Sequence, residues 1–164
     1  MPDDIVTPSG LRLRVEDVEY QRPNGAPLLA RLYRPEGPGP FAGIVDVHGG
    51  AWNRGDRFTN AARMEMICET GVVALSLDFR MPPVASYPVS VQDINFGIRW
   101  FKARCAAWGV DPRRVGGFGA SSGGHQIYLS AMRPNDPRYI AIKAPGLEKV
   151  DARLHYVIGC WPVI

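Results

Sequence analysis

The stretch from Gly116 to His125, which reads GGFGASSGGH, constrains the fold more than any other part of the chain. Within it, Gly119 and Gly123 stand two residues before and two residues after Ser121, the spacing G-x-S-x-G. A serine can occupy a sharp turn from a strand into a helix only if its neighbours at these two positions are very small. The spacing therefore predicts such a turn, with Ser121 at its tip.

The segments on both sides of this stretch favour that interpretation over a flexible glycine-rich loop. Residues 114–118 are typical of a buried strand, and residues 126–132 have the composition of a helix. The turn would leave the Ser122 N–H at a helix start, where unpaired donors and the positive end of the helix dipole favour an oxyanion. Ser121 is therefore our candidate nucleophile.

Composition excludes several other classes of protein. The 164 residues fit one domain, and 46% hydrophobic with 21% charged residues is ordinary for a globular chain. The net charge of +3 is spread along the sequence, so we expect no nucleic-acid partner. No apolar run is long enough to span a bilayer, so we expect no membrane partner. The acidic start, Met1 to Asp4, lacks the features of a signal peptide, which favours a cytoplasmic protein.

Three cysteines, Cys68, Cys105 and Cys160, lie far apart inside apolar segments. An odd number at wide spacing fits neither a disulfide framework nor a metal site, so we expect buried free thiols. We expect no metal and no cofactor.

Taken in order, the chain alternates strand and helix patterns after an initial hairpin. This order predicts an α/β fold in three layers, with a mostly parallel sheet and an antiparallel N-terminal strand pair. The expected strands are residues 11–20, 28–33, 42–47, 72–77, 114–118 and 154–164, and the expected helices are residues 59–70, 91–108 and 126–132.

Several further motifs occur in a fixed order around the serine. His48 to Trp52 reads HGGAW, residues 78–80 read DFR, Asp93 leads a helix with Trp100, and residues 111–115 read DPRRV. Over residues 30–130 the chain resembles the N-terminal part of HGG-motif esterases of the α/β-hydrolase superfamily, the hormone-sensitive-lipase-like and acetyl- or feruloyl-esterase-like enzymes.

This resemblance implies a serine carboxylester hydrolase that acts on a small-molecule ester, with Ser121 as nucleophile. It also implies an oxyanion hole from the backbone N–H groups of Gly49, Gly50, Ala51 and Ser122. Glycines let backbone donors approach a developing oxyanion, which agrees with this reading. His48 is implied to shape its loop, and we interpret Asp93 as a structural carboxylate.

The acid and base of the catalytic triad are missing from the expected positions. In this superfamily they follow the serine along the chain, after strands that would lie beyond Ile164. His155 would open the last strand, about 20 Å from Ser121 at 3.3 Å per residue. We therefore expect an incomplete domain over residues 1–164, truncated after the sixth strand and inactive alone, with His125 or His48 as weak alternatives for the base.

Two other functions stay open at this stage. The chain could belong to a non-catalytic hydrolase-like protein that binds ligands or forms a homo-oligomer through its apolar C-terminal strand edge. The same turn and oxyanion hole would also serve an amide hydrolase, such as an arylformamidase- or peptidase-like enzyme.

Overall fold

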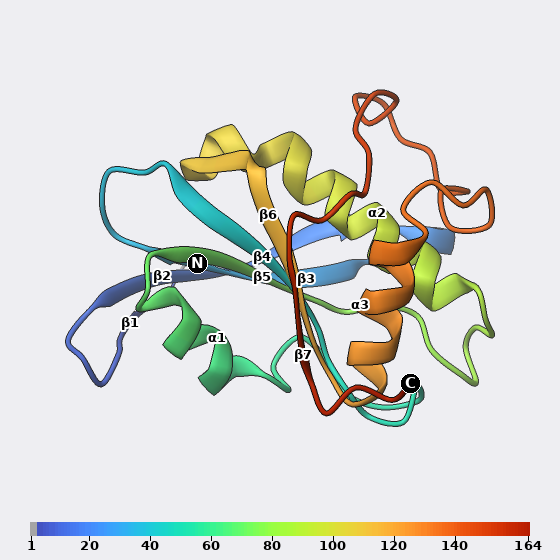
Figure 1. The fold of residues 1–164 in the computed structure, drawn as a ribbon, viewed down its shortest axis with the longest axis horizontal. Coiled ribbons are helices and arrows are strands. Elements are labelled where there is room, and N and C mark those ends of the chain that lie inside the picture. The colour runs from blue at the N-terminus through green and yellow to red at the C-terminus, as the bar shows by residue number, and fades with distance from the viewer. Residues whose placement is uncertain (1–2) are drawn as a thin grey trace.

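The computed structural model describes residues 3–164, which form a seven-stranded mixed sheet between helices (Figure 1). The strand order across the sheet is β1-β2-β3-β5-β4-β6-β7. The strands are β1 (Asp3–Val6), β2 (Arg12–Gln21), β3 (Leu28–Pro35), β4 (Phe41–Val47), β5 (Val72–Leu77), β6 (Val110–Ala120) and β7 (Val157–Cys160). The helices are α1 (Ala61–Cys68), α2 (Val89–Arg104) and α3 (Ser122–Met132).

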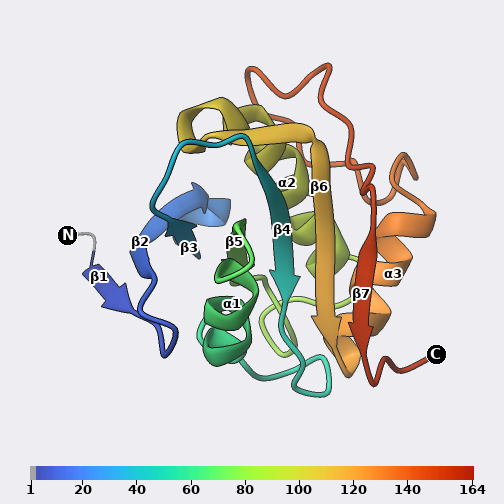
Figure 2. The same ribbon diagram turned by 60° about the vertical axis from the view of Figure 1, so that its left-hand side comes forward.

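Two kinds of strand pairing divide the sheet. β1, β2, β3 and β5 are antiparallel neighbours, whereas β5, β4, β6 and β7 run parallel to one another. α1 covers one face, and α2 and α3 cover the other (Figure 2). This arrangement confirms the predicted three-layer α/β fold with an antiparallel start. The count of six strands was wrong, because β1 adds a further strand at the edge of β2.

Each face of the sheet has its own hydrophobic core, as the alternation of side chains along β4 requires. Ile44 packs with Met64 and other residues on the α1 side. Val45 and Val47 belong to the larger core on the side of α2 and α3, together with Ile98. Both faces of β4 are therefore buried, which explains its continuous apolar run.

The long helix is shorter than the pattern indicated. α2 ends at Arg104, and Cys105–Trp108 form a turn of 3-10 helix before Gly109, which has the left-handed φ of 66° expected at a stop. Gly97 lets α2 approach the sheet closely, since a Cβ there would lie 2.6 Å from a methyl carbon of Leu77. Along α2 the apolar residues recur at three-four spacing, as in a helix with one buried face, and those at Ile94 and Phe101 are fully buried.

The last segment differs most from its prediction. A strand over residues 154–164 was expected, but β7 covers only Val157–Cys160, and its end coincides with Trp161, which takes a left-handed φ of 47° that a strand cannot continue through. Ile158 and Trp161 are exposed on this edge of the sheet. The three cysteines are free, and Cys160 is only half-buried rather than buried. Within residues 3–164, no helix is both long enough and apolar enough to cross a membrane.

Candidate functional site

Ser121 occupies a strained turn between the end of β6 and the first residue of α3. Its backbone has φ 51° and ψ −124°, a combination that non-glycine residues rarely adopt. The Ser121 N–H donates to the carbonyl oxygen of Cys160 at 2.9 Å, which anchors the turn to the end of β7. The predicted sharp turn from strand to helix is therefore present, with the helix starting at residue 122 rather than 126.

The two glycines of the motif are required by contacts with backbone. A Cβ on Gly119 would lie 2.5 Å from the carbonyl oxygen of Gly123. A Cβ on Gly123 would lie 2.1 Å from the carbonyl oxygen of Val47, at the end of β4. Any larger residue would force apart the turn and the neighbouring strand, so the spacing has the steric cause that the sequence indicated.

The loop that follows β4 lies directly against Ser121. A Cβ on Gly49 would lie 2.8 Å from the carbonyl oxygen of Ala120 and 3.3 Å from the Cβ of Ser121. Gly50, Ala51 and Trp52 then have three consecutive positive φ values, 123°, 52° and 63°. Such a run is costly for the two non-glycine residues and persists only where surrounding contacts fix it.

The predicted site residues therefore come together from two loops. Gly49 contacts the turn, and the Trp52 N–H donates to the Oγ of Ser122 at 3.3 Å. In the part of the chain that the structure describes, the N–H groups of Gly50 and Ala51 donate to no protein acceptor. Ser122 is the first residue of α3, where N–H groups lack an intrahelical partner.

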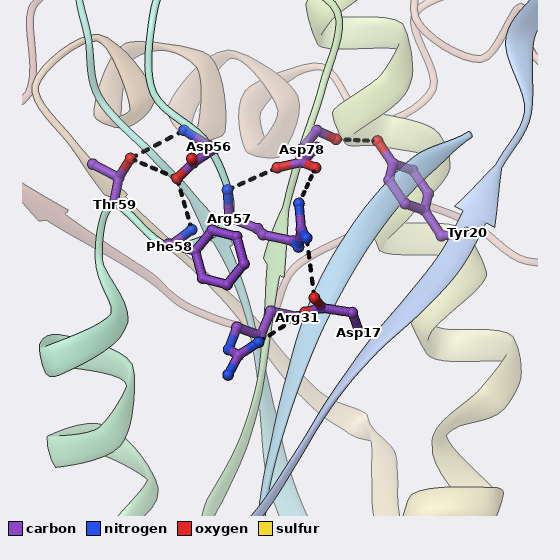
Figure 3. Close-up of polar contacts among 8 residues, drawn as sticks. All are labelled: Asp17, Tyr20, Arg31, Asp56, Arg57, Phe58, Thr59 and Asp78. Carbon is purple, nitrogen blue, oxygen red and sulfur yellow. Dashed lines mark hydrogen bonds and ion pairs between the residues drawn. The ribbon is translucent and has the colours of Figure 1, made fainter. Parts of the chain in front are cut away.

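An arginine holds this loop in place (Figure 3). Arg57 donates from its backbone N–H and its Nη1 to the carboxylate of Asp78, both at 2.8 Å, and from its Nη2 to Asp17 at 3.0 Å. Asp78 follows β5 and Asp17 lies in β2, so the loop between β4 and α1 is tied to two strands. The ring of Phe58 lies under the guanidinium groups of Arg31 and Arg57, at 5.0 and 4.3 Å. Sequence reasoning missed this network, although the residues 78–80 motif marked Asp78.

Asp46 is a buried carboxylate on the same strand as the loop. Its oxygens accept hydrogen bonds from Asn60 Nδ2 and Ser76 Oγ, both at 2.8 Å. Burial raises the pKa of Asp46 to about 6, although both donors oppose that shift. Asn60 immediately precedes α1, so Asp46 joins β4 to the start of that helix. Its only sequence signal is one acidic residue within an apolar run.

Each of the three histidines in the described residues has hydrogen-bond partners other than the Ser121 hydroxyl. The His48 ring is 1% exposed, stacks on Phe79 at 4.3 Å, and its Nδ1 hydrogen bonds to the Gly49 carbonyl oxygen at 2.7 Å. Burial lowers the pKa of His48. His125 Nδ1 accepts a hydrogen bond from Trp52 Nε1 at 3.3 Å, and the His155 N–H donates to the carbonyl oxygen of Val115, six residues before Ser121. Within residues 3–164, no histidine nitrogen hydrogen bonds to the Ser121 hydroxyl.

Asp93 has structural partners. It is fully buried and accepts hydrogen bonds from Arg80 through its N–H, Nε and Nη2 at 2.7–3.0 Å, and from Gln21 Nε2 at 3.2 Å. These bonds join α2 to the segment after β5. Among the described residues, no group of three or more His, Cys, Asp or Glu side chains is placed to hold a metal ion.

The strand order and the strained serine turn define the α/β-hydrolase fold. Esterase 2 of Thermogutta terrifontis, phosphorylated by paraoxon, superposes with a TM-score of 0.81 at 24% identity, over 92% of this chain and 58% of that chain. Esterase LipW of Mycobacterium marinum gives a TM-score of 0.76 at 22% identity, over 93% of this chain and 45% of that chain.

The chain belongs to the BD-FAE family, whose sequence model matches residues 31–158. Among curated proteins of Mycobacterium tuberculosis, it is 31% identical to the probable carboxylic ester hydrolase LipM, over 73% of this chain and 27% of that protein. It is 33% identical to esterase LipC, over 72% of this chain and 29% of that protein. The chain thus spans less than a third of the length of these two relatives.

Proposed function

We propose that the protein containing this chain is a serine carboxylester hydrolase in which Ser121 is the nucleophile. The strained turn that presents Ser121 beside the Gly49 loop is the observation that carries this proposal. The esterase relatives and the esterases with the same fold support the reaction class.

In the proposed reaction, the Ser121 Oγ attacks the ester carbonyl carbon and forms a tetrahedral intermediate. The negative charge on the carbonyl oxygen is stabilised by backbone N–H groups of Gly50, Ala51 and Ser122, with Gly49 shaping the loop or adding a further donor. Donors aimed at an oxyanion in advance contribute about 3 to 4 kcal/mol each to transition-state stabilisation. Collapse of the intermediate releases the alcohol and leaves an acyl group on Ser121, which water then hydrolyses.

Ser121 needs a base to take its proton, and the histidines of this chain have other partners. His125 pairs with Trp52, and His155 lies beside Val115. We therefore assign the base and the acid to parts of the protein outside residues 1–164, and expect near-background ester hydrolysis from this chain alone. The greater length of the curated relatives supports this assignment.

A fluorophosphonate probe tests the nucleophile in the complete protein. We expect the probe to label the protein and a Ser121→Ala variant to lose both the label and turnover of p-nitrophenyl acetate, by several orders of magnitude. A Ser130→Ala variant, in the same helix but buried away from the turn, should keep both. Labelling that survives in Ser121→Ala would refute the assignment.

A further inference from the structure

A cavity of about 660 Å³ lies between α2 and the long segment that connects α3 to β7. Arg99 of α2 lines it, together with side chains of the connecting segment between Asn135 and Ala152. Because β7 runs parallel to β6, this segment reaches the end of the sheet opposite the one where Ser121 lies (Figure 2). The cavity is therefore separate from the proposed ester site, and its volume lies in the range of small-molecule sites.

Arg99 is a buried cation without a counter-charge. It is 4% exposed, and its Nε and Nη2 donate to Asn95 Oδ1 at 2.9 Å and to the Ile142 carbonyl oxygen at 2.8 Å. Within residues 3–164, no carboxylate forms an ion pair with Arg99, and its Nη1 makes no hydrogen bond. A buried guanidinium that lacks an anion is unfavourable, so an anion in the cavity would stabilise it.

The other charged side chains around the cavity favour the same sign of ligand. Lys143 and Lys149 line it and add positive charge. Of the two lining carboxylates, Asp151 pairs with Lys102 Nζ at 2.6 Å, and Glu148 accepts a hydrogen bond from the Gly146 N–H at 3.2 Å. Asp151 is therefore neutralised by Lys102, so the lining carries the three cations Arg99, Lys143 and Lys149 against the single unpaired carboxylate of Glu148, and Arg99 itself has no ion-pair partner among the described residues.

Apolar side chains form much of the remaining wall. Ile140, Leu147, Val150 and Ala152 line the cavity, and Leu147 and Ala152 are buried in the core below it. A ligand that fills the space must therefore combine an anionic group with a hydrocarbon part. Inorganic phosphate would leave the apolar wall uncovered, and a neutral alcohol would leave Arg99 without a counter-charge.

We propose that this cavity binds a small carboxylate with an apolar tail, whose carboxylate pairs with Arg99 and whose tail lies against Leu147 and Val150. The inference rests on these cavity residues and is independent of the role proposed for Ser121.

Isothermal titration of the complete protein with octanoate tests the inference. We expect octanoate to bind, and octanol, octylamine and inorganic phosphate to bind at least tenfold more weakly. If octanol bound as tightly as octanoate, Arg99 would not select the ligand. If phosphate bound as tightly as octanoate, the apolar wall would not select it. Either result would overturn the proposal.

Two substitutions locate the binding. Arg99→Met removes the charge, and Ala144→Phe fills the cavity without altering Arg99, so each should weaken octanoate binding at least tenfold while fluorophosphonate labelling of Ser121 stays unchanged. Arg104→Met is the matched control, because Arg104 lies on the same helix over the ring of Trp100 and outside the cavity. If Arg99→Met does not fold, Ala144→Phe decides alone. Unchanged octanoate affinity in Ala144→Phe would overturn the proposal.

Discussion

The backbone N–H of Trp52 donates to the side-chain Oγ of Ser122 at 3.3 Å, across seventy positions of sequence. This bond joins the loop after β4 to the first turn of α3, the two segments that carry the predicted site residues. The geometry of the site therefore depends on contacts between loops as well as on the strained turn itself.

Ser122→Ala should lower kcat/KM of the complete protein about fivefold, because a hydrogen bond worth about 1 kcal/mol no longer fixes the loop. The hydrolysis of p-nitrophenyl butyrate measures this. Ser130→Ala is the control, because the Ser130 Oγ is buried in the same helix and has no hydrogen-bond partner in the described residues. Equal losses in the two variants would contradict the role given to the Trp52 bond.

Asp46 should make the free energy of unfolding depend on pH. Burial raises its pKa to about 6, above the unfolded value near 3.9, so the folded state holds the proton more tightly. The stability from this group is fully present below about pH 4 and is lost as pH rises to about 6. Asp46→Asn should therefore be more stable than the parent at pH 7, by on the order of 2 kcal/mol, and equal to it near pH 4. Urea unfolding across this range measures the difference, and a constant difference at all pH values would contradict the shift.

Gly123→Ala should destabilise the fold by at least ~2 kcal/mol and abolish turnover, because its Cβ would meet the carbonyl oxygens of Val47 and His48. Gly10→Ala provides a control for backbone strain alone, since Gly10 has a positive φ and no atom within 4 Å of the added Cβ. That change should cost about 1 kcal/mol and preserve turnover. Thermal unfolding and ester hydrolysis are measured for both variants. Equal losses of stability and turnover in Gly123→Ala and Gly10→Ala would argue against a steric requirement at the turn.

Arg57→Met should lower thermal stability by about 1 to 2 kcal/mol and reduce kcat, because Asp78 loses its ion-pair partner, Asp17 keeps only Arg31, and the loop loses its anchor. Arg113→Met removes an ion pair whose arginine side chain is 86% exposed, so it should change stability by less than about 0.5 kcal/mol. A loss of stability with unchanged kcat would contradict the role proposed for Arg57 in turnover, because the anchored loop would then affect folding alone.

Local patterns predicted most of the fold. The G-x-S-x-G spacing gave the turn, and the three-four spacing of α2 gave its buried face, because both depend on short-range sterics and periodicity. β1 was not predicted, because only two of its four residues, Ile5 and Val6, are apolar. This strand forms through its pairing with β2, which no local pattern indicates. The end of β7 was overextended because an apolar run does not reveal where the backbone turns, as it does at Trp161.

The site was predictable only in part for a similar reason. The G-x-S-x-G spacing named Ser121 and its two glycines, and the family resemblance added the HGGAW loop; the structure brings these together. The partners of Arg57 and the pairing of His125 with Trp52 join residues far apart in sequence, which no local pattern specifies. His125 follows Ser121 by four positions, yet its ring pairs with Trp52.

The strand order also has a consequence for folding kinetics. Val47 is paired with Gly119 in the parallel ladder between β4 and β6, so the two loops of the site meet only after a long stretch of chain has closed. Closing such non-local contacts slows folding. We therefore expect the environment of Trp52 to reach its native state late in refolding, after the β2 and β3 hairpin has formed.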